Sequence, residues 1–201
     1  MIRIDGVLVS RGQGGVYGER MLGDLRVWDP YRSKLAALCY QDTGVELAPG
    51  MRVLYLGAAH GTTVSHVADY TDVVYAVEIA PRPMQDLLEV ARRRTNIVPI
   101  MADAARPEQY ARLVEPVDMV YQDVAQPDQV AIALANCIFL KPGGTLILML
   151  KTRSVDTRRD PAAVFSDAVA RLAAGGGVLV RDSAWLAPYH HDHAAIICTA
   201  T

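Results

Sequence analysis

The sequence predicts an α/β fold built on a seven-stranded, mostly parallel sheet whose last strand runs antiparallel. Short apolar runs alternate with helical segments of about 10 to 15 residues, the pattern of βαβ units around a sheet covered on both faces. The last two runs, residues 178–180 and 194–199, are joined by a connection too short for a helical crossover, so we expect them to pair antiparallel.

The N-terminal part is expected to differ from the rest. Short aliphatic runs alternate there with the glycine-rich stretch 12–15, which predicts hairpins. We therefore expect a small elaboration over residues 1–28 and the main domain over residues 29–201. Asp29-Pro30 is typical of a helix N-cap followed by proline at the first helical position, and predicts a helix through Leu38.

The remaining elements follow from apolar periodicity and from proline and glycine punctuation. Strands are expected at residues 53–56, 73–78, 96–101, 117–121, 145–150, 178–180 and 194–199. Helices are expected to start at Thr62-Thr63, to cover residues 83–94, to run from Gln126-Pro127 to Phe139, and to start at Asp160-Pro161.

Composition indicates a globular chain with little general attraction to nucleic acid. The 201 residues are 51% hydrophobic and carry a formal net charge of −2, so any RNA must be bound locally or with help. No apolar run reaches the roughly 18 residues that span a bilayer, and the charged N-terminus does not fit a signal peptide. We therefore expect a cytoplasmic protein without membrane contact. Cys39, Cys137 and Cys198 are expected to be reduced core residues.

The stretch 52–69 is the most informative part of the sequence. An apolar strand, a glycine turn and a helix start at Thr62-Thr63 follow one another without a break, a combination that holds nucleotide-like ligands. A dinucleotide fingerprint needs three glycines, but the chain has Gly57, Ala59 and Thr62 at those positions. The turn therefore suits a ligand with an amino-acid carboxylate beside a ribose, such as S-adenosylmethionine, better than a nicotinamide dinucleotide.

Charged residues follow nearly every predicted strand, at the edge where open α/β sheets bind ligands. Glu78 is placed to bind two ribose hydroxyls, with an acidic helix cap as the alternative. Asp103 is expected either to hydrogen-bond an adenine amino group or to cap a helix. Asp123 and Lys151 end neighbouring strands, where they form either a catalytic pair or a structural ion pair.

The histidine-rich stretch 190–193 does not predict a metal site. Consecutive residues near a strand start point in different directions and do not converge on one ion. A single histidine facing the site is the more reasonable expectation.

Five segments, in order and over almost the whole chain, resemble the fibrillarin family, particularly its archaeal members, which methylate ribose 2′-hydroxyls in pre-rRNA and tRNA. The segments are Val16-Tyr17-Gly18-Glu19, Trp28 to Ala37 (WDPYRSKLAA), Tyr55 to Val67 (YLGAAHGTTVSHV), Asp123 to Pro127 (DVAQP) and Asp192-His193-Ala194.

The resemblance implies a Rossmann-like class I S-adenosylmethionine-dependent methyltransferase fold and an RNA ribose 2′-O-methyltransferase. The implied catalytic group is Lys34, Asp123, Lys151 and His193. The implied cofactor-binding residues follow three strands and the glycine turn: Gly57, Ala58, Ala59, Thr62, Thr63, Glu78, Ile79, Asp103, Ala104, Asp123, Val124, Ala125 and Gln126.

The resemblance also implies a guide ribonucleoprotein with a Nop5-type (Nop56/58-type) scaffold, an L7Ae-type protein and a box C/D guide RNA, acting on rRNA and tRNA. Arg153, Arg158 and Arg159 are candidates for contacting substrate phosphates, with a solvated loop as an equal alternative. A stand-alone RNA or protein methyltransferase and a non-catalytic assembly subunit remain the alternatives for function.

Two departures from the family pattern bear on the cofactor pocket. Gln122 stands where a small residue is usual and is expected to crowd the pocket, and His60 stands where serine is usual. Lys151 is the candidate for positioning the ribose hydroxyl, with Asp123 fixing it. A role for Lys151 as a base would require a lowered pKa, and the sequence leaves the direction of that shift open.

Overall fold

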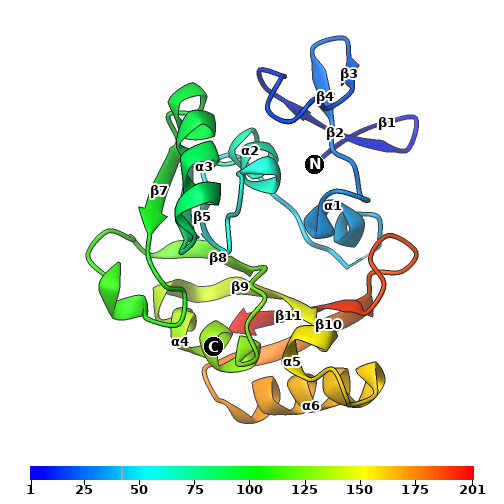
Figure 1. Ribbon diagram of the computed structural model, residues 1–201, viewed down its shortest axis with the longest axis vertical. Helices are drawn as coiled ribbons and strands as arrows, with labels where there is room; N and C mark the ends of the chain where they lie inside the picture. The colour runs from blue at the N-terminus through cyan, green and yellow to red at the C-terminus, as the bar shows by residue number, and fades with distance from the viewer. Residues whose placement is uncertain (42) are drawn as a thin grey trace.

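The computed structural model describes residues 1–41 and 43–201 and contains the predicted seven-stranded sheet (Figure 1). The strands are β5 (Arg52–Leu56), β6 (Val73–Glu78), β7 (Ile97–Met101), β8 (Val117–Gln122), β9 (Leu140–Lys151), β10 (Val178–Trp185) and β11 (His193–Ala200). Their order is β10-β11-β9-β8-β5-β6-β7, and β11 pairs antiparallel with both neighbours while the other pairs are parallel. The expected fold class is confirmed.

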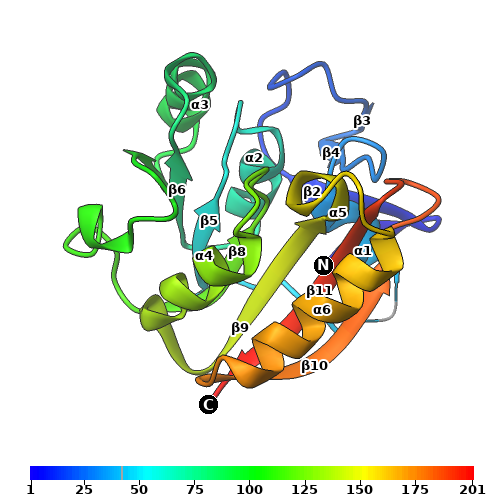
Figure 2. The same cartoon turned by 60° about the horizontal axis from the view of Figure 1, so that its bottom comes forward.

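The first residues form a separate antiparallel sheet, as the hairpin prediction requires. Its strands are β1 (Ile2–Ile4), β2 (Val7–Arg11), β3 (Met21–Leu22) and β4 (Leu25–Val27), in the order β1-β2-β4-β3. This small sheet lies beside the first two helices of the main body (Figures 1 and 2).

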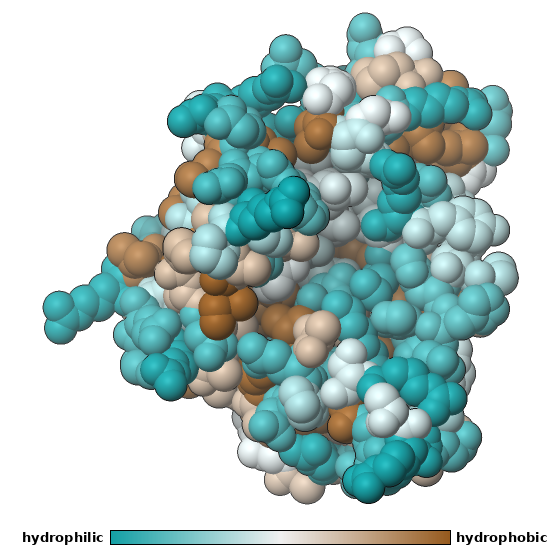
Figure 3. All heavy atoms as spheres, viewed as in Figure 1, coloured by the Kyte–Doolittle hydropathy of each residue, from teal (hydrophilic) through white to brown (hydrophobic). Residues whose placement is uncertain are grey.

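Helices cover both faces of the main sheet (Figures 1 and 2). They are α1 (Lys34–Cys39), α2 (Thr62–Ala68), α3 (Pro81–Arg93), α4 (Gln129–Asn136), α5 (Thr152–Val155) and α6 (Pro161–Ala174), with 3-10 turns at Pro107–Gln109 and Cys137–Phe139. Helices α1 to α3 pack on one face and α4 and α6 on the other. The face drawn in Figure 3 is hollowed across its middle, and mostly polar side chains surround the recess.

The two faces follow from alternation along the central strands. In β5, Val53 and Tyr55 pack in the core under α1 to α3, whereas Leu54 and Leu56 pack in the core under α4 and α6. All four side chains are buried, so the strand reads as a continuous apolar run in the sequence.

Three predicted helix starts differ from the structure, and one of them is that of α3, which begins at Pro81 rather than at residue 83. The first helix begins at Lys34 rather than at Pro30, because Asp29 forms a turn in which its Oδ1 accepts from Tyr31 N at 2.8 Å. Ser33 is the N-cap, and its Oγ accepts from Ala36 N at 3.2 Å. The fourth helix begins at Gln129 rather than at 126–127. By contrast, Asp160 caps α6 as expected, with Oδ2 accepting from Ala163 N at 3.2 Å.

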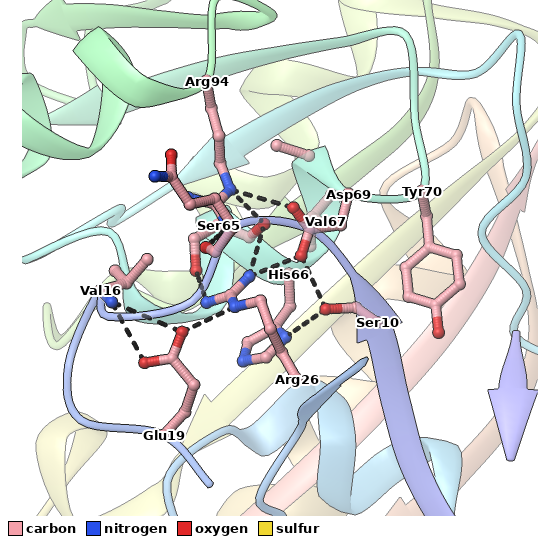
Figure 4. Close-up of polar contacts among 12 residues, drawn as sticks. Ser10, Val16, Glu19, Arg26, Ser65, His66, Val67, Asp69, Tyr70 and Arg94 are labelled. Atoms are coloured by element: carbon pink, nitrogen blue, oxygen red, sulfur yellow. Dashed lines mark hydrogen bonds and ion pairs between the residues drawn. The ribbon is translucent and has the colours of Figure 1, made fainter. Parts of the chain in front are cut away.

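A buried ionic network joins the small sheet to the main body (Figure 4). The Arg26 guanidinium from β4 is fully buried and pairs with Glu19 at 2.6 Å and with Asp69 at 2.5 Å. Asp69 follows α2 and also pairs at 3.0 Å with Arg94, which follows α3. The Ser65 hydroxyl of α2 accepts a further hydrogen bond from Arg26 at 2.8 Å. Two cations and two carboxylates thus compensate one another where water is excluded.

His66 of α2 also connects the main body to the N-terminal segment. Its ring stacks on Trp28, with centroids 5.0 Å apart, and its nitrogens lie 2.7 Å from the Ser10 and Tyr17 hydroxyls. Ser10 donates its one proton to Asp69, so His66 Nδ1 donates to Ser10 and Nε2 accepts from Tyr17. Burial, with Arg26 nearby, lowers the pKa of His66 to about 2. The ring is therefore a neutral, fixed part of the interface.

Other expectations from composition can be compared with the structure. Cys39 and Cys198 are buried, Cys137 is half-buried, and all three are free thiols, as predicted. Within residues 1–41 and 43–201, no helix combines the length and the apolar character that crossing a membrane requires. The same part of the chain holds no group of three metal-ligating side chains.

The buried network predicts a large stability effect at Asp69. Asp69→Asn leaves Arg26 and Arg94 with less compensating charge in a dry site, and we expect the free energy of unfolding to fall by about 3–5 kcal/mol. Urea denaturation followed by circular dichroism measures the change. Glu89→Gln is the control, because Glu89 pairs with Arg92 on the exposed surface of α3, and it should change stability by less than about 1 kcal/mol. Equal effects of the two substitutions would contradict a compensating role for Asp69.

Candidate active site

The predicted site residues gather where the strand order changes direction. From β5, the chain proceeds through β6 and β7 to one side, and then through β8 and β9 to the other. The ends of β5 and β8 therefore border the switch point at which open α/β sheets bind ligands. Gly57 follows β5 and Asp123 follows β8. A Cβ on Gly57 would lie 2.6 Å from the Asp123 carbonyl oxygen, so only glycine allows this approach.

Two adjoining hollows open at this point and share Gly57, Ala59 and Asp123. The larger, of about 380 Å³, is lined by Gly57, Ala59, Val77, Glu78, Ile79, Pro83, Ala102, Ala104, Asp123, Val124, Ala125, Gln126 and Lys151. The smaller, of about 190 Å³, is lined by Arg32, Tyr55, Gly57, Ala58, Ala59, His60, Thr62, Thr63 and Asp123. Every residue expected to bind the cofactor lines one of these hollows, except Asp103.

Glu78 and Asp103 differ in what their carboxylates do. Glu78 Oε2 accepts from Ala59 N at 2.8 Å and Oε1 from Ala80 N at 2.7 Å. These bonds fix the carboxylate at the rim of the larger hollow and leave lone pairs for two ligand hydroxyls. Asp103 Oδ1 instead accepts from Ala105 N at 2.9 Å within a turn, and because no helix begins at Ala104, the helix-cap alternative is wrong.

Asp123 lies between the two predicted lysines. Lys34 Nζ, from the first turn of α1, donates to Oδ2 at 3.0 Å, and Lys151 Nζ, from the end of β9, lies 3.1 Å from Oδ1. Burial alone would raise the pKa of Asp123, but the two ammonium groups outweigh it and hold that pKa below its ordinary value. The carboxylate therefore stays ionised between two cations.

A pair of buried glutamines fixes the backbone that carries Lys151. The carboxamide of Gln129 accepts from Lys151 N at 2.9 Å and donates to Lys151 O at 3.1 Å. Gln122 Nε2 in turn donates to Gln129 O at 2.7 Å. Gln122 is fully buried and does not line either hollow, so the expectation that it crowds the cofactor pocket is wrong. Its carboxamide instead forms a hydrogen bond to the first residue of α4, Gln129.

Sheet register places His193 beside Lys151. The two residues are direct partners of the antiparallel β9 and β11 pair, so their side chains emerge on the same face. His193 Nδ1 lies 2.6 Å from the His191 carbonyl oxygen, which only accepts hydrogen bonds. Nδ1 therefore carries the proton and Nε2 keeps a lone pair. Burial, opposed in part by the His191 contact, lowers the pKa of His193, so its ring is neutral near pH 7.

The other singled-out residues are His60, which lines the smaller hollow, and three arginines that line neither hollow. His60 pairs with Asp86 at 2.6 Å, but both side chains are more than half exposed, so the pair is a weak surface contact. Arg153 in α5 lies 3.4 Å from Asp192, Arg159 lies 3.7 Å from Asp167, and Arg158 is 91% exposed.

The sequence profile of fibrillarin matches residues 8–201. The chain belongs to the fibrillarin family. The fibrillarin-like rRNA/tRNA 2′-O-methyltransferase of Methanoculleus marisnigri is 71% identical to it over 193 residues, 96% of either chain.

Solved fibrillarin structures agree with this assignment. A fibrillarin/Nop5p complex contains a chain that superposes with a TM-score of 0.92 and 40% identity, covering 98% of this chain and 96% of that one. The Aeropyrum pernix fibrillarin with natively bound S-adenosyl-L-methionine superposes with a TM-score of 0.85 and 41% identity, covering 96% and 88%.

Two positions at the site, Arg32 and Gln129, were not predicted from the sequence. Arg32 lines the smaller hollow, although its only sequence signal is that it lies in the segment that resembles the family. Gln129 brackets the Lys151 backbone, but a glutamine at a helix start carries no mark of that role. Spacing does not reveal either position, because the contacts join segments that are distant in the chain.

Proposed function

We propose that this chain transfers a methyl group from S-adenosylmethionine to ribose 2′-hydroxyls of rRNA and tRNA, as the catalytic subunit of a box C/D guide ribonucleoprotein. The observation that carries the proposal is the Asp123 carboxylate between two lysines, at the wall shared by both hollows. Family membership supports the reaction class.

The residues around the hollows fit this cofactor. Glu78 presents a fixed carboxylate for the ribose diol, and the small apolar side chains of Ala102 and Ala104 suit an adenine face. Gly57 leaves the backbone uncovered where the hollows meet. When bound, the cofactor supplies an electrophilic methyl group on a sulfonium. We propose that Asp103 contacts the adenine through the carboxylate lone pairs that its hydrogen bond from Ala105 N leaves available.

The catalytic side chains then have separate tasks. A ribose hydroxyl must be aligned for in-line displacement and must lose its proton. Lys34 and Lys151 both lie against the ionised Asp123 carboxylate, and we assign them to orient the hydroxyl oxygen by donating hydrogen bonds. His193 is neutral and its Nε2 has a free lone pair, so we assign it as the acceptor of the hydroxyl proton.

The partners in the proposed particle supply the RNA targeting that the surface of this chain does not provide. A net charge of −2 gives no long-range attraction to RNA, so targeting is assigned to a Nop5-type scaffold, an L7Ae-type protein and the guide RNA. The similar fibrillarin in complex with Nop5p supports the first of these partners. Arg153, Arg158 and Arg159 lie just beyond Lys151 and are proposed to contact substrate phosphates.

Lys151→Ala tests the proposed reaction. In a particle reconstituted with scaffold, L7Ae-type protein and guide RNA, transfer of labelled methyl should fall about 100-fold or more, because a donor to the reacting oxygen is lost. Binding of S-adenosylhomocysteine, measured by calorimetry, should change little. Lys141→Ala is the matched control, since Lys141 pairs with Asp118 at 2.6 Å away from both hollows.

Three outcomes would contradict the proposal. Normal transfer by Lys151→Ala would remove the assigned role of that lysine. Methyl transfer by the wild-type chain without guide RNA would favour a stand-alone methyltransferase, and cofactor binding without any transfer would favour a non-catalytic subunit.

Because His193 is proposed to accept the proton as a neutral ring, its pKa determines where the rate of methyl transfer falls at acid pH. Its pKa is lowered below the ordinary value of 6.5, so the proton-accepting form persists below pH 6.5 and is lost only at more acid pH. We expect single-turnover methyl transfer at saturating substrates to decline with a midpoint below 6.5. His193→Gln should reduce the rate about 100-fold or more and remove that limb. His191→Gln, an exposed neighbour, should do neither. An unchanged limb in His193→Gln would refute the assignment.

A further inference from the structure

Arg32 is an uncompensated cation at the smaller hollow. It lies on the turn between Asp29 and α1, and it lines both the smaller hollow, together with Asp123, and a second recess, together with Tyr17, Glu19 and Asp29. Among residues 1–41 and 43–201, no carboxylate lies within 4.0 Å of its guanidinium. This distinguishes it from Lys34 and Lys151, whose charges Asp123 balances.

The guanidinium is nevertheless held in place. It lies over the Tyr17 ring, 5.4 Å from the centroid, and its Nη1 donates to the Tyr17 carbonyl oxygen at 3.4 Å. Tyr17 is itself fixed, because its hydroxyl donates to His66 Nε2 at 2.7 Å. His66 belongs to the buried network of Figure 4. The small sheet therefore orients Arg32 through Tyr17 and leaves most of its five donors unused.

The charge balance of the smaller hollow favours an anion. Within residues 1–41 and 43–201, Asp123 is the only acid in its lining, and its two oxygens face Lys34 and Lys151. His60 is paired with Asp86 outside the lining. Lys34, Lys151 and Arg32 carry three positive charges against the one negative charge of Asp123, and the next carboxylates, Asp29 and Glu19, line the other recess at Arg32. An oxyanion bound there would restore the balance.

We propose that Arg32 binds an oxyanion in the smaller hollow during methyl transfer. The inference rests on the proposed function, because that reaction brings two oxyanions to the smaller hollow. One is the carboxylate at the amino-acid end of the cofactor, and the other is the phosphate 3′ of the target ribose, which is adjacent to the reacting 2′-hydroxyl. Both present coplanar or paired oxygens that match the planar fork of arginine better than the point charge of lysine.

The first arm of the test measures cofactor binding. Calorimetry compares S-adenosylhomocysteine with 5′-methylthioadenosine, which lacks the amino-acid end, on the wild-type chain, Arg32→Ala and Arg32→Lys. If the carboxylate is the ligand, Arg32→Ala weakens S-adenosylhomocysteine about tenfold or more and leaves methylthioadenosine unchanged. Arg32→Lys should recover part of the loss.

The second arm measures RNA in the reconstituted particle at saturating cofactor. If the phosphate is the ligand, Arg32→Ala raises the KM for target RNA about tenfold or more and leaves S-adenosylhomocysteine binding unchanged. A methylphosphonate 3′ of the target ribose should then raise the KM of the wild type but not that of Arg32→Ala.

Controls separate the possible failures. Arg171→Ala removes an exposed arginine from the last turn of α6, away from both hollows, and should match the wild type in both arms. Arg32 is exposed, and its variants should keep the wild-type unfolding transition. If Arg32→Ala matches the wild type in cofactor affinity and in RNA kinetics, the inference is wrong. If the wild type itself binds no S-adenosylhomocysteine, the proposed function fails and the inference fails with it.

Discussion

The contact on which the site depends is the Asp123 carboxylate between Lys34 and Lys151. It joins three elements that are far apart in the sequence, namely the turn after β8, the start of α1 and the end of β9. One partly buried carboxylate compensates two cations, so none of the three groups is left as an isolated charge. The same contact separates the chemical roles, because lysines paired with a carboxylate suit donating hydrogen bonds, whereas the neutral His193 suits accepting a proton.

The rest of the fold serves to hold these elements in position. Ser33 caps α1 ahead of Lys34, and Thr63 Oγ1 donates to the Ser33 hydroxyl at 3.1 Å. Helix α2, which carries Thr63, is anchored at its other end by the buried pair of Asp69 and Arg26. The small N-terminal sheet is thus connected through α2 and Ser33 to the start of α1, which carries Lys34. On the opposite side, the Gln129 carboxamide fixes the Lys151 backbone in both of its hydrogen bonds.

The sheet and most site positions were predictable, because strand alternation and charged residues after strands are local signals. Asp123 and Lys151 were identified this way, and sheet register explains why they meet. The start of α1 was not predictable from Asp29-Pro30, since the same dipeptide also forms a turn. Gln122 was misread because the direction of a buried side chain at a strand end depends on tertiary contacts, here with Gln129. Arg32 had no signal beyond its place in the family-like segment Trp28 to Ala37.

The ionisation state of Asp123 tests this account most directly. The ¹³C resonance of its side-chain carboxyl, titrated by NMR in the folded protein, should show a pKa below the ordinary value of 3.8. Lys34→Met removes one of the two compensating cations, and the pKa should then rise. A wild-type carboxyl that titrates at or above 3.8, or that does not respond to the loss of Lys34, would contradict the claim that the two lysines hold it ionised.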